Sequence, residues 1–214
     1  MAETARQQKA TPQLEDIELI SEGWISKYLL TYRMPDGGTF RYESTSRKKL
    51  EAYRAELMRN AEQEAPTPDA VCIVPVLPDK SLLLIREFRY PLNSWCIAFP
   101  AGLIEPGEDL AESIDRELRE ETGYRVRREL GGSALMPLPQ SGYSSTGMTE
   151  ENVQVVIAQV EPQAAGAPEP EPTEFIEPFI LKREDVAAFL EENATPIGTR
   201  CQLLLEAAKR ATDF

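Results

Sequence analysis

The chain of 214 residues carries 36 Asp and Glu against 23 Lys and Arg, which gives a formal net charge of −13 at pH 7. This balance argues against general nucleic-acid binding, because that function requires a basic surface. The chain contains no histidine, which excludes Ser-His-Asp and Cys-His catalysis, histidine metal sites and histidine phosphotransfer. A general base must therefore be a carboxylate or, less commonly, a Lys or Tyr side chain.

Composition also bounds the class of protein and its compartment. The chain is 42% hydrophobic and 28% charged, as globular proteins are, and its length suits one domain with a small appendage. No apolar run reaches membrane-spanning length, and the N-terminal residues lack the apolar core of a secretory signal. The 3 cysteines fit no metal-binding or redox spacing. We therefore expect a cytoplasmic protein that binds neither nucleic acid nor a membrane.

Apolar patterns and turn residues predict strands on both sides of one central helix. Before that helix, the sequence predicts strands at 17–34 and 39–44 around a turn, a helix at 47–64, and strands at 71–77, 81–87 and 95–99. After it come a strand at 153–160, a Pro- and Glu-rich loop at 161–173, a strand at 175–181, and helices at 183–192 and 197–211. This order indicates an α/β (α+β) fold with helices around a mixed sheet.

The central helix is predicted by Leu110, Ile114 and Leu118, which recur at every fourth position and form one apolar stripe. Turn residues and acids at 106–109 suit its beginning, because they complement the free N–H groups there. Gly123 suits its end. The sequence therefore predicts an amphipathic helix with one buried face.

The polar side of this helix carries Glu117, Glu120 and Glu121. Helical spacing places Glu117 directly over Glu121, with Glu120 beside them. Like charges at this spacing repel one another, and carboxylate oxygens are ligands that suit Mg²⁺ or Mn²⁺. Arg116 can hold one glutamate by a bidentate pair. The alternative interpretation is a solvated acidic helix face, which is common in proteins.

Residues 102–124 fill every position of the spacing G-x5-E-x7-R-E-U-x-E-E-x-G-U, where U is apolar. This pattern resembles the Nudix box, the signature of Mg²⁺-dependent hydrolases that cut nucleoside diphosphates linked to another group. The resemblance implies an α/β/α sandwich with a mixed sheet. It also favours the metal-binding interpretation of the glutamates over the solvated face.

The surrounding sequence is similar to the ADP-ribose pyrophosphatases and related nucleotide-sugar hydrolases, from about residue 17 to 210. The similarity is carried by Arg86–Pro91 (REFRYP), Phe99–Ile104 (FPAGLI) and the segment that begins at Thr173 (TEFIE). The resemblance implies metal ligands at Ala101, through its backbone carbonyl, and at Glu117 and Glu121, with Glu120 as a ligand for a second metal and Glu108 as an accessory residue.

The same branch implies a general base outside the box, on a mobile loop between the last strands. Glu174 is the matching residue, and nearby Glu171 is the alternative. A flexible acidic loop can bring a carboxylate to the attacking water once substrate has bound. The competing interpretation is that this segment is only a solvated acidic loop.

The branch also implies substrate contacts. Arg89 matches an arginine that contacts the phosphates, Trp24 and Tyr42 match aromatics that sandwich the adenine, and Arg47 matches a neighbouring basic position. The alternative for the aromatics is burial in a small N-terminal antiparallel sheet. In such relatives the N-terminal strands reach a second subunit, so the resemblance implies a homodimer. It also implies a base-binding and dimerisation region at 1–68 and a hydrolase domain at 69–214.

One departure leaves the substrate open. ADP-ribose hydrolases often carry a proline beyond the box in a pattern like S-S-P-G, and here Thr146 occupies that place. We therefore expect a metal-dependent hydrolase of a nucleotide sugar, with ADP-ribose first and UDP-glucose, ADP-glucose, GDP-mannose or a dinucleotide as alternatives. A sensor that binds ADP-ribose without turnover is disfavoured, because the box carboxylates are all present. Hydrolysis of oxidised nucleoside triphosphates is disfavoured by the flanking sequence.

Overall fold

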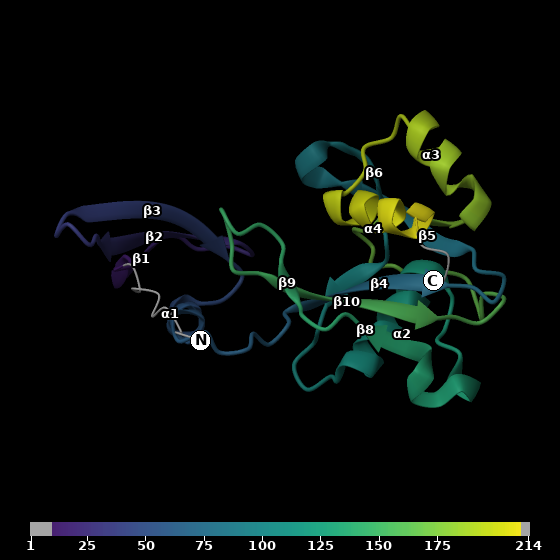
Figure 1. Ribbon diagram of the computed structural model, residues 1–214, viewed down its shortest axis with the longest axis horizontal. Coiled ribbons are helices and arrows are strands. Elements are labelled where there is room, and N and C mark those ends of the chain that lie inside the picture. The colour runs from purple at the N-terminus through teal and green to yellow at the C-terminus, as the bar shows by residue number, and fades with distance from the viewer. Residues whose placement is uncertain (1–9, 211–214) are drawn as a thin grey trace, which may run out of the picture. The chain divides into compact units, whose positions relative to one another are not determined.

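The computed structural model describes residues 10–210, and the described chain divides into two compact units. One unit comprises the residues up to Thr67 together with Tyr143–Asn152, and the other comprises Pro68–Gly142 together with the residues from Val153 onward (Figure 1). Each unit has hydrophobic clusters of its own. In the described part of the chain, no helix is both long and apolar enough to cross a membrane.

The first unit contains an antiparallel sheet in the order β1-β2-β3, followed by a helix. Its elements are β1 (Gln13–Ser21), β2 (Ser26–Arg33), β3 (Thr39–Ser46) and α1 (Leu50–Ala61). The prediction of unbroken strand at 17–34 was wrong, because a turn at 22–25 around Gly23 separates β1 from β2. The turn at 35–38 and the helix within 47–64 are confirmed.

Packing against the sheet holds α1 in place. Its N-cap, Lys49, makes no side-chain capping bond, so local signals at that end are weak. The helix instead buries Tyr53 against Tyr28, whose ring centroid lies 4.7 Å away, with Ile17 and Leu30 in the same cluster. Tertiary burial of the aromatic ring therefore fixes this helix more than its caps do.

The second unit contains a mixed sheet in the order β11-β5-β4-β10-β8, with β6 paired to β5 and β7 paired to β4. The strands are β4 (Ala70–Val76), β5 (Leu82–Arg89), β6 (Ser94–Ala98), β7 (Ala101–Leu103), β8 (Leu135–Pro137), β9 (Gly142–Tyr143), β10 (Asn152–Gln159) and β11 (Ile176–Leu181). β4 and β10 run parallel, whereas the pairs of β4 with β7 and of β5 with β11 are antiparallel. The predicted mixed sheet is confirmed.

Helices cover both faces of this sheet. They are α2 (Leu110–Thr122), α3 (Val186–Glu192) and α4 (Thr199–Arg210), with short 3₁₀ turns at Tyr90–Leu92, Arg128–Ala134 and Arg183–Asp185. Figure 1 shows α2 and α4 on opposite sides of β4 and β10. The last residue of the helix predicted at 197–211 lies outside the described residues.

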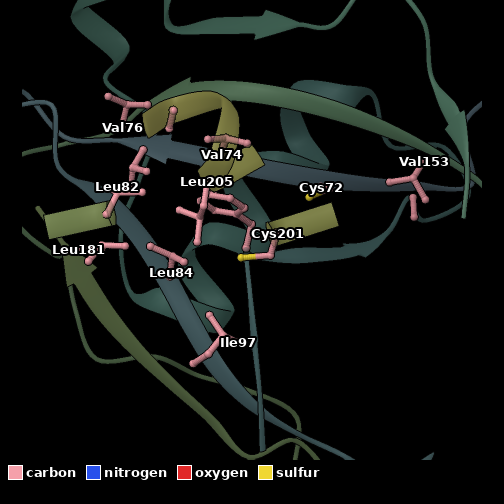
Figure 2. Packing of buried hydrophobic residues seen from close by; sticks show 14 residues of the cluster. Cys72, Val74, Val76, Leu82, Leu84, Ile97, Val153, Leu181, Cys201 and Leu205 are labelled. Carbon is pink, nitrogen blue, oxygen red and sulfur yellow. The ribbon is translucent and has the colours of Figure 1, made fainter. Parts of the chain in front are cut away.

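The alternation of side chains along β4 explains why both faces are covered. Cys72, Val74 and Val76 pack in one cluster with Cys201 and Leu205 of α4 (Figure 2). The intervening residues Val71 and Ile73 pack in a second cluster with Ile114 and Leu118 of α2. A strand buried on both faces reads as a continuous apolar run, and the α/β/α sandwich is confirmed.

Candidate active site

The helix that carries the glutamates is defined by local signals at both ends. At its beginning, Asp109 and Glu112 form a reciprocal capping box: the Glu112 N–H donates to Asp109 Oδ1 at 2.9 Å, and the Asp109 N–H donates to Glu112 Oε2 at 3.0 Å. At its end, Gly123 adopts the left-handed conformation with φ of 76°, which favours glycine. Ile114 and Leu118 are fully buried. The predicted helix is confirmed, and its polar face is held in a fixed orientation.

Gly102 on β7 allows the closest approach in the site. A Cβ atom built at this position would lie 1.9 Å from Glu117 Oε1 and 2.1 Å from its Cδ. Any side chain larger than hydrogen would therefore displace the carboxylate. The first glycine of the sequence pattern is required because the Glu117 carboxylate lies directly against the backbone of β7.

Arg116 uses all of its donors within the protein. Its Nε donates to Glu108 Oε1 at 2.7 Å and its Nη2 to Glu108 Oε2 at 3.0 Å and to the Leu103 carbonyl at 2.9 Å. Its Nη1 donates to Glu117 Oε1 at 2.7 Å and Glu120 Oε2 at 3.3 Å. A guanidinium has five N–H donors, so Arg116 orients the glutamates and keeps no donor for a substrate.

The two glutamates one helical turn apart are buried. Glu117 is 8% exposed and Glu121 is 5% exposed, and Glu121 Oε2 accepts a 3.0 Å hydrogen bond from the Ala101 N–H. Burial, followed by the charges of Glu117 and Glu87, raises the pKa of Glu121 well above its ordinary value. Burial also raises the pKa of Glu117, against the opposing effect of Arg116. The site thus concentrates negative charge where water cannot screen it.

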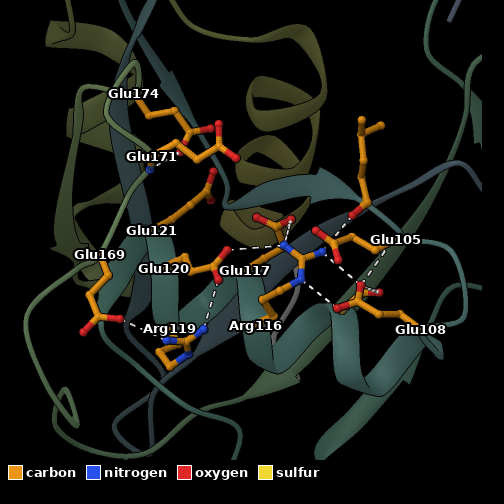
Figure 3. A network of polar contacts seen from close by, with 12 residues as sticks. Glu105, Glu108, Arg116, Glu117, Arg119, Glu120, Glu121, Glu169, Glu171 and Glu174 are labelled. Atoms are coloured by element: carbon orange, nitrogen blue, oxygen red, sulfur yellow. Dashed lines mark hydrogen bonds and ion pairs between the residues drawn. The ribbon is translucent and has the colours of Figure 1, made fainter.

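The loop between β10 and β11, residues 161–175, brings another carboxylate to this cluster; we call it the acidic loop. The charge of Glu174 contributes to the raised pKa values of Glu87, Glu117 and Glu121. The Glu171 N–H donates to Glu174 Oε2 at 3.0 Å, which fixes the Glu174 side chain across a tight turn. Figure 3 shows Glu174 and Glu171 on the acidic loop, near the α2 glutamates.

Glu120 is held by two arginines. Its Oε2 accepts from Arg116 at 3.3 Å, and its Oε1 accepts from Arg119 at 2.9 Å. Each oxygen therefore has an arginine partner in this structure (Figure 3). Two arginine bonds leave Glu120 with less free acceptor capacity for a cation than Glu117 and Glu121, each of which accepts one bond.

The donor set suits a hard divalent cation. Glu117 and Glu121 offer buried carboxylate oxygens, and the negative charges of Glu87 and Glu174 surround them. A divalent cation held by these carboxylates would offset the repulsion that raises their pKa values. Within residues 10–210, no group of at least three Asp, Glu or Cys side chains already surrounds one point as a complete metal site does.

Arg89 lies at the edge of the same site. Its Nη2 lies 2.6 Å from Glu87 Oε1, and both residues line a cavity of about 210 Å³ together with Tyr90, Glu174 and Phe175. Burial raises the pKa of Glu87, and Arg89 opposes that rise. Sequence reasoning missed Glu87, although a glutamate directly after the apolar run of β5 was a usable signal.

The residues predicted to bind the base lie in the first unit, and the structure does not bring the two aromatics together. Trp24 is 77% exposed in the turn between β1 and β2. Tyr42 pairs with Leu30 in the middle of the β2–β3 ladder, and its hydroxyl donates to the Gly147 carbonyl at 2.8 Å. Arg47 forms an ion pair with Glu151.

Tyr42 also lines an apolar cavity of about 620 Å³ within the first unit. The other lining residues include Phe40, Tyr53 and Tyr143, and Thr146 lies at the same cavity. Trp24 is not among its lining residues. Within one chain, Tyr42 and Thr146 therefore line the same cavity, and Trp24 lies outside it.

A model of the NUDIX domain matches residues 66–199. The ADP-sugar pyrophosphatase of Mus musculus is 31% identical over 183 residues, covering 81% of this chain and 75% of that protein. The ADP-ribose pyrophosphatase of Saccharomyces cerevisiae is 27% identical over 204 residues, covering 89% and 79%.

A solved structure of an ADP compounds hydrolase superposes with a TM-score of 0.66 at 22% identity. The match covers 92% of this chain and 93% of that one. At this identity the likeness supports the fold alone, and it agrees with the sandwich described above.

Proposed function

The chain belongs to the Nudix family, and on that premise we propose that it is a metal-dependent pyrophosphatase of nucleoside diphosphate sugars, with ADP-ribose as its first substrate. ADP-ribose would yield AMP and ribose 5-phosphate. The observation that carries this proposal is the buried Glu117–Glu121 pair on α2, with Glu174 of the acidic loop in its electrostatic surroundings. The printed names of the relatives from mouse and yeast support the substrate class.

Glu117, Glu121 and the Ala101 carbonyl are the groups that would hold Mg²⁺ or Mn²⁺, and Glu120 would serve a second ion. The bound cation would neutralise pyrophosphate charge and activate the attacking water. Gly102 and Arg116 act through Glu117, because they fix where its carboxylate lies. Phosphoryl transfer depends mainly on such positioning and charge stabilisation.

Glu174 is the proposed general base. Water attacks one phosphorus, the P–O bond of the pyrophosphate bridge breaks, and the proton released by the water passes to a Glu174 oxygen. Glu171 is the alternative base, because it lies three residues away in the same turn. Arg89 would pair with the substrate phosphates, and its position beside the cavity next to Glu174 supports that role.

The first unit would bind the base and form the dimer. The exposure of Trp24 argues against a core role and leaves its indole ring free to contact a ligand or a second subunit. Tyr42 and Arg47 would complete the base site. We assign the protein to a reducing cytoplasm, which is compatible with the buried free thiols Cys72, Cys96 and Cys201.

The test is product analysis after incubation with Mg²⁺ and a panel of ADP-ribose, ADP-glucose, UDP-glucose and GDP-mannose, with Glu121→Gln as control. AMP from ADP-ribose in the wild type and not in the variant supports the proposal. Preferential cleavage of another sugar nucleotide would support the proposed pyrophosphatase reaction with a different substrate. The altered preference would then be assigned to the segment around Thr146. Tight ADP-ribose binding without cleavage of any substrate would replace the hydrolase with a sensor.

A further inference from the structure

The acidic loop is attached to the C-terminal end of α2 by a short series of contacts. The Ala165 N–H donates to the Gly123 carbonyl at 2.8 Å, and the Glu169 N–H donates to the Glu120 carbonyl at 2.8 Å. Arg119 Nη1 donates to Glu169 Oε2 at 3.0 Å. These bonds join residues about 40 to 50 positions apart, so they are tertiary contacts rather than local turns.

Arg119 contacts both the acidic loop and α2. Its Nη1 binds Glu169 on the acidic loop, and its Nη2 donates to Glu120 Oε1 at 2.9 Å (Figure 3). The Nudix pattern leaves the position of Arg119 open, between the required Leu118 and Glu120. The family pattern therefore assigns this arginine no role, and its contacts are the evidence for one.

The loop passes very close to the helix end. A Cβ atom built at Gly123 would lie 2.2 Å from the Gly166 carbonyl oxygen, and Gly123 has φ of 76°. This glycine is therefore required for two reasons, since it ends α2 and also leaves room for the loop backbone. The close approach means that the loop rests on α2 rather than extending away from it.

The attached part of the loop leads directly to the carboxylate of the site. Glu169, which Arg119 holds, precedes the turn in which Glu174 Oε2 accepts the Glu171 N–H. The pKa values of Glu117 and Glu121 both respond to the charge of Glu174. On either side of Glu174, the Tyr90 hydroxyl donates to the Thr173 carbonyl and the Phe88 N–H donates to the Phe175 carbonyl, each at 3.0 Å. Releasing the loop at Glu169 would therefore leave Glu174 held from the β5 side alone.

We propose that Arg119 is a positioning residue that fixes the acidic loop on α2 and thereby sets both the location of Glu174 and the orientation of Glu120. This inference rests on the proposed function for its catalytic consequence. Exposed ion pairs contribute little to overall stability, and the Arg119–Glu169 pair is partly exposed. Loss of Arg119 should therefore lower kcat and speed amide exchange in the acidic loop, while the melting temperature stays the same.

The variants are Arg119→Met, which keeps the apolar stem but removes the guanidinium, Arg119→Lys, Glu169→Gln and the double variant Arg119→Met/Glu169→Gln. The matched control is Arg125→Met. Arg125 and Arg119 are similar in distance to one carboxylate and in exposure. Arg125 lies 3.0 Å from Asp115 and its side chain is 40% exposed, and Arg119 lies 3.0 Å from Glu169 and its side chain is 37% exposed. The Arg125 guanidinium pairs with Asp115 and not with the acidic loop or the glutamates of the site. The Glu161 N–H at the start of the loop donates to the Arg125 backbone carbonyl at 2.9 Å, and the substitution leaves that backbone bond in place.

Steady-state kinetics with ADP-ribose and Mg²⁺ provide the first measurement. Arg119→Met should lower kcat about tenfold with KM within about twofold, because misplacing a catalytic group costs rate more than binding. Arg119→Lys should restore part of the loss. The double variant should be no slower than Arg119→Met alone, since Glu169→Gln removes an interaction that Arg119→Met has already removed. A kcat equal to that of Arg125→Met, or losses that multiply in the double variant, would overturn the inference.

Amide hydrogen exchange provides a second measurement that does not depend on turnover. The Ala165 and Glu169 amides should exchange severalfold faster in Arg119→Met than in Arg125→Met, with an unchanged melting temperature. Unchanged exchange at these amides would overturn the inference. If the wild type cleaves no nucleotide sugar, the proposed function fails, and the exchange result alone then decides whether Arg119 fixes the loop.

Discussion

The two regions that supply carboxylates to the site, α2 and the acidic loop, are held in different ways. α2 has a capping box, a left-handed glycine cap and an apolar stripe in which Ile114 and Leu118 are fully buried. Its glutamates are further fixed by the Arg116 fork and the Ala101 amide. The acidic loop has no regular secondary structure, and a few contacts with α2 and with Phe88 and Tyr90 hold it.

The difference separates two requirements of the proposed chemistry. Metal ligands need fixed geometry, which rigid elements with locked side chains provide. A base that acts only when substrate is present can be carried by a segment of lower local stability, which is able to move as substrate enters. Changes in α2 should therefore abolish activity, whereas changes in the acidic loop should reduce it by degrees.

The largest expected effect is that of Glu121→Gln. We expect kcat to fall by ~10³-fold or more, because the buried carboxylate is lost from the electrostatic centre of the site. The melting temperature should stay the same or rise, since the amide removes repulsion with Glu117 and Glu87. Activity assays and thermal denaturation check both parts. Wild-type activity in this variant would remove the argument that α2 holds the metal.

Gly102→Ala tests whether the fixed geometry of α2 matters beyond its charges. The added methyl group would meet Glu117 Oε1 at 1.9 Å, so the carboxylate must move, and we expect kcat to fall by ~10²-fold. Gly132→Ala is the matched control, because a Cβ at Gly132 meets nothing within 4 Å. Equal kinetics for the two variants would show that the position of Glu117 is not critical.

Glu174→Gln tests the acidic loop. General-base catalysis contributes roughly 10²- to 10⁴-fold. We expect kcat to fall by about 10²-fold, at the low end of that range, because Glu171 in the same turn can substitute in part. KM should change little. Glu171→Gln, in the same turn, serves as the comparison. A larger loss in Glu171→Gln than in Glu174→Gln would transfer the role of base to Glu171.

A residue outside both regions should affect binding rather than turnover. We expect Trp24→Ala to raise KM for ADP-ribose by about tenfold, given ~1–3 kcal/mol for base stacking on an aromatic side chain. Because Trp24 is exposed, the free energy of unfolding should not change. KM measurements and urea denaturation check these two statements. An unchanged KM with lower stability would assign Trp24 to packing.

The smallest expected effect concerns stability at low pH. Hydrogen bonds from Arg116 and then Ser113 lower the pKa of Glu108 to about 2, whereas the unfolded value is about 4.3. The contribution of ionised Glu108 is therefore fully present above that unfolded value and is lost as pH falls towards 2.

Urea denaturation of the wild type and Glu108→Gln checks this linkage. The wild type should be more stable at pH 7, and the difference should shrink between pH 5 and pH 3. A difference independent of pH would mean that the Glu108–Arg116 bonds do not stabilise the folded helix through the charge of Glu108. The bonds of Arg116 to Glu108 would then not be what fixes α2.

Much of α2 and of the central sheet could be predicted, because their signals are local. Asp109 and Gly123 lie next to the residues that they cap, and the stripe from Leu110 to Leu118 is defined within three helical turns. The apolar run of β4 already indicated burial on both faces. The turn around Gly23 was missed, because strand-forming residues on both sides masked a single glycine.

The box helix, the kind of sheet and the pair of glutamates one turn apart follow from the sequence, because local patterns of apolar, capping and turn residues indicate them. The folded structure was needed to show that Gly102 lies against Glu117, that Glu87 joins the carboxylates, and that Arg119 connects Glu120 to Glu169. Those contacts join residues far apart in sequence. Spacing along the chain carries no information about them until the strands pair and the loop packs on the helix.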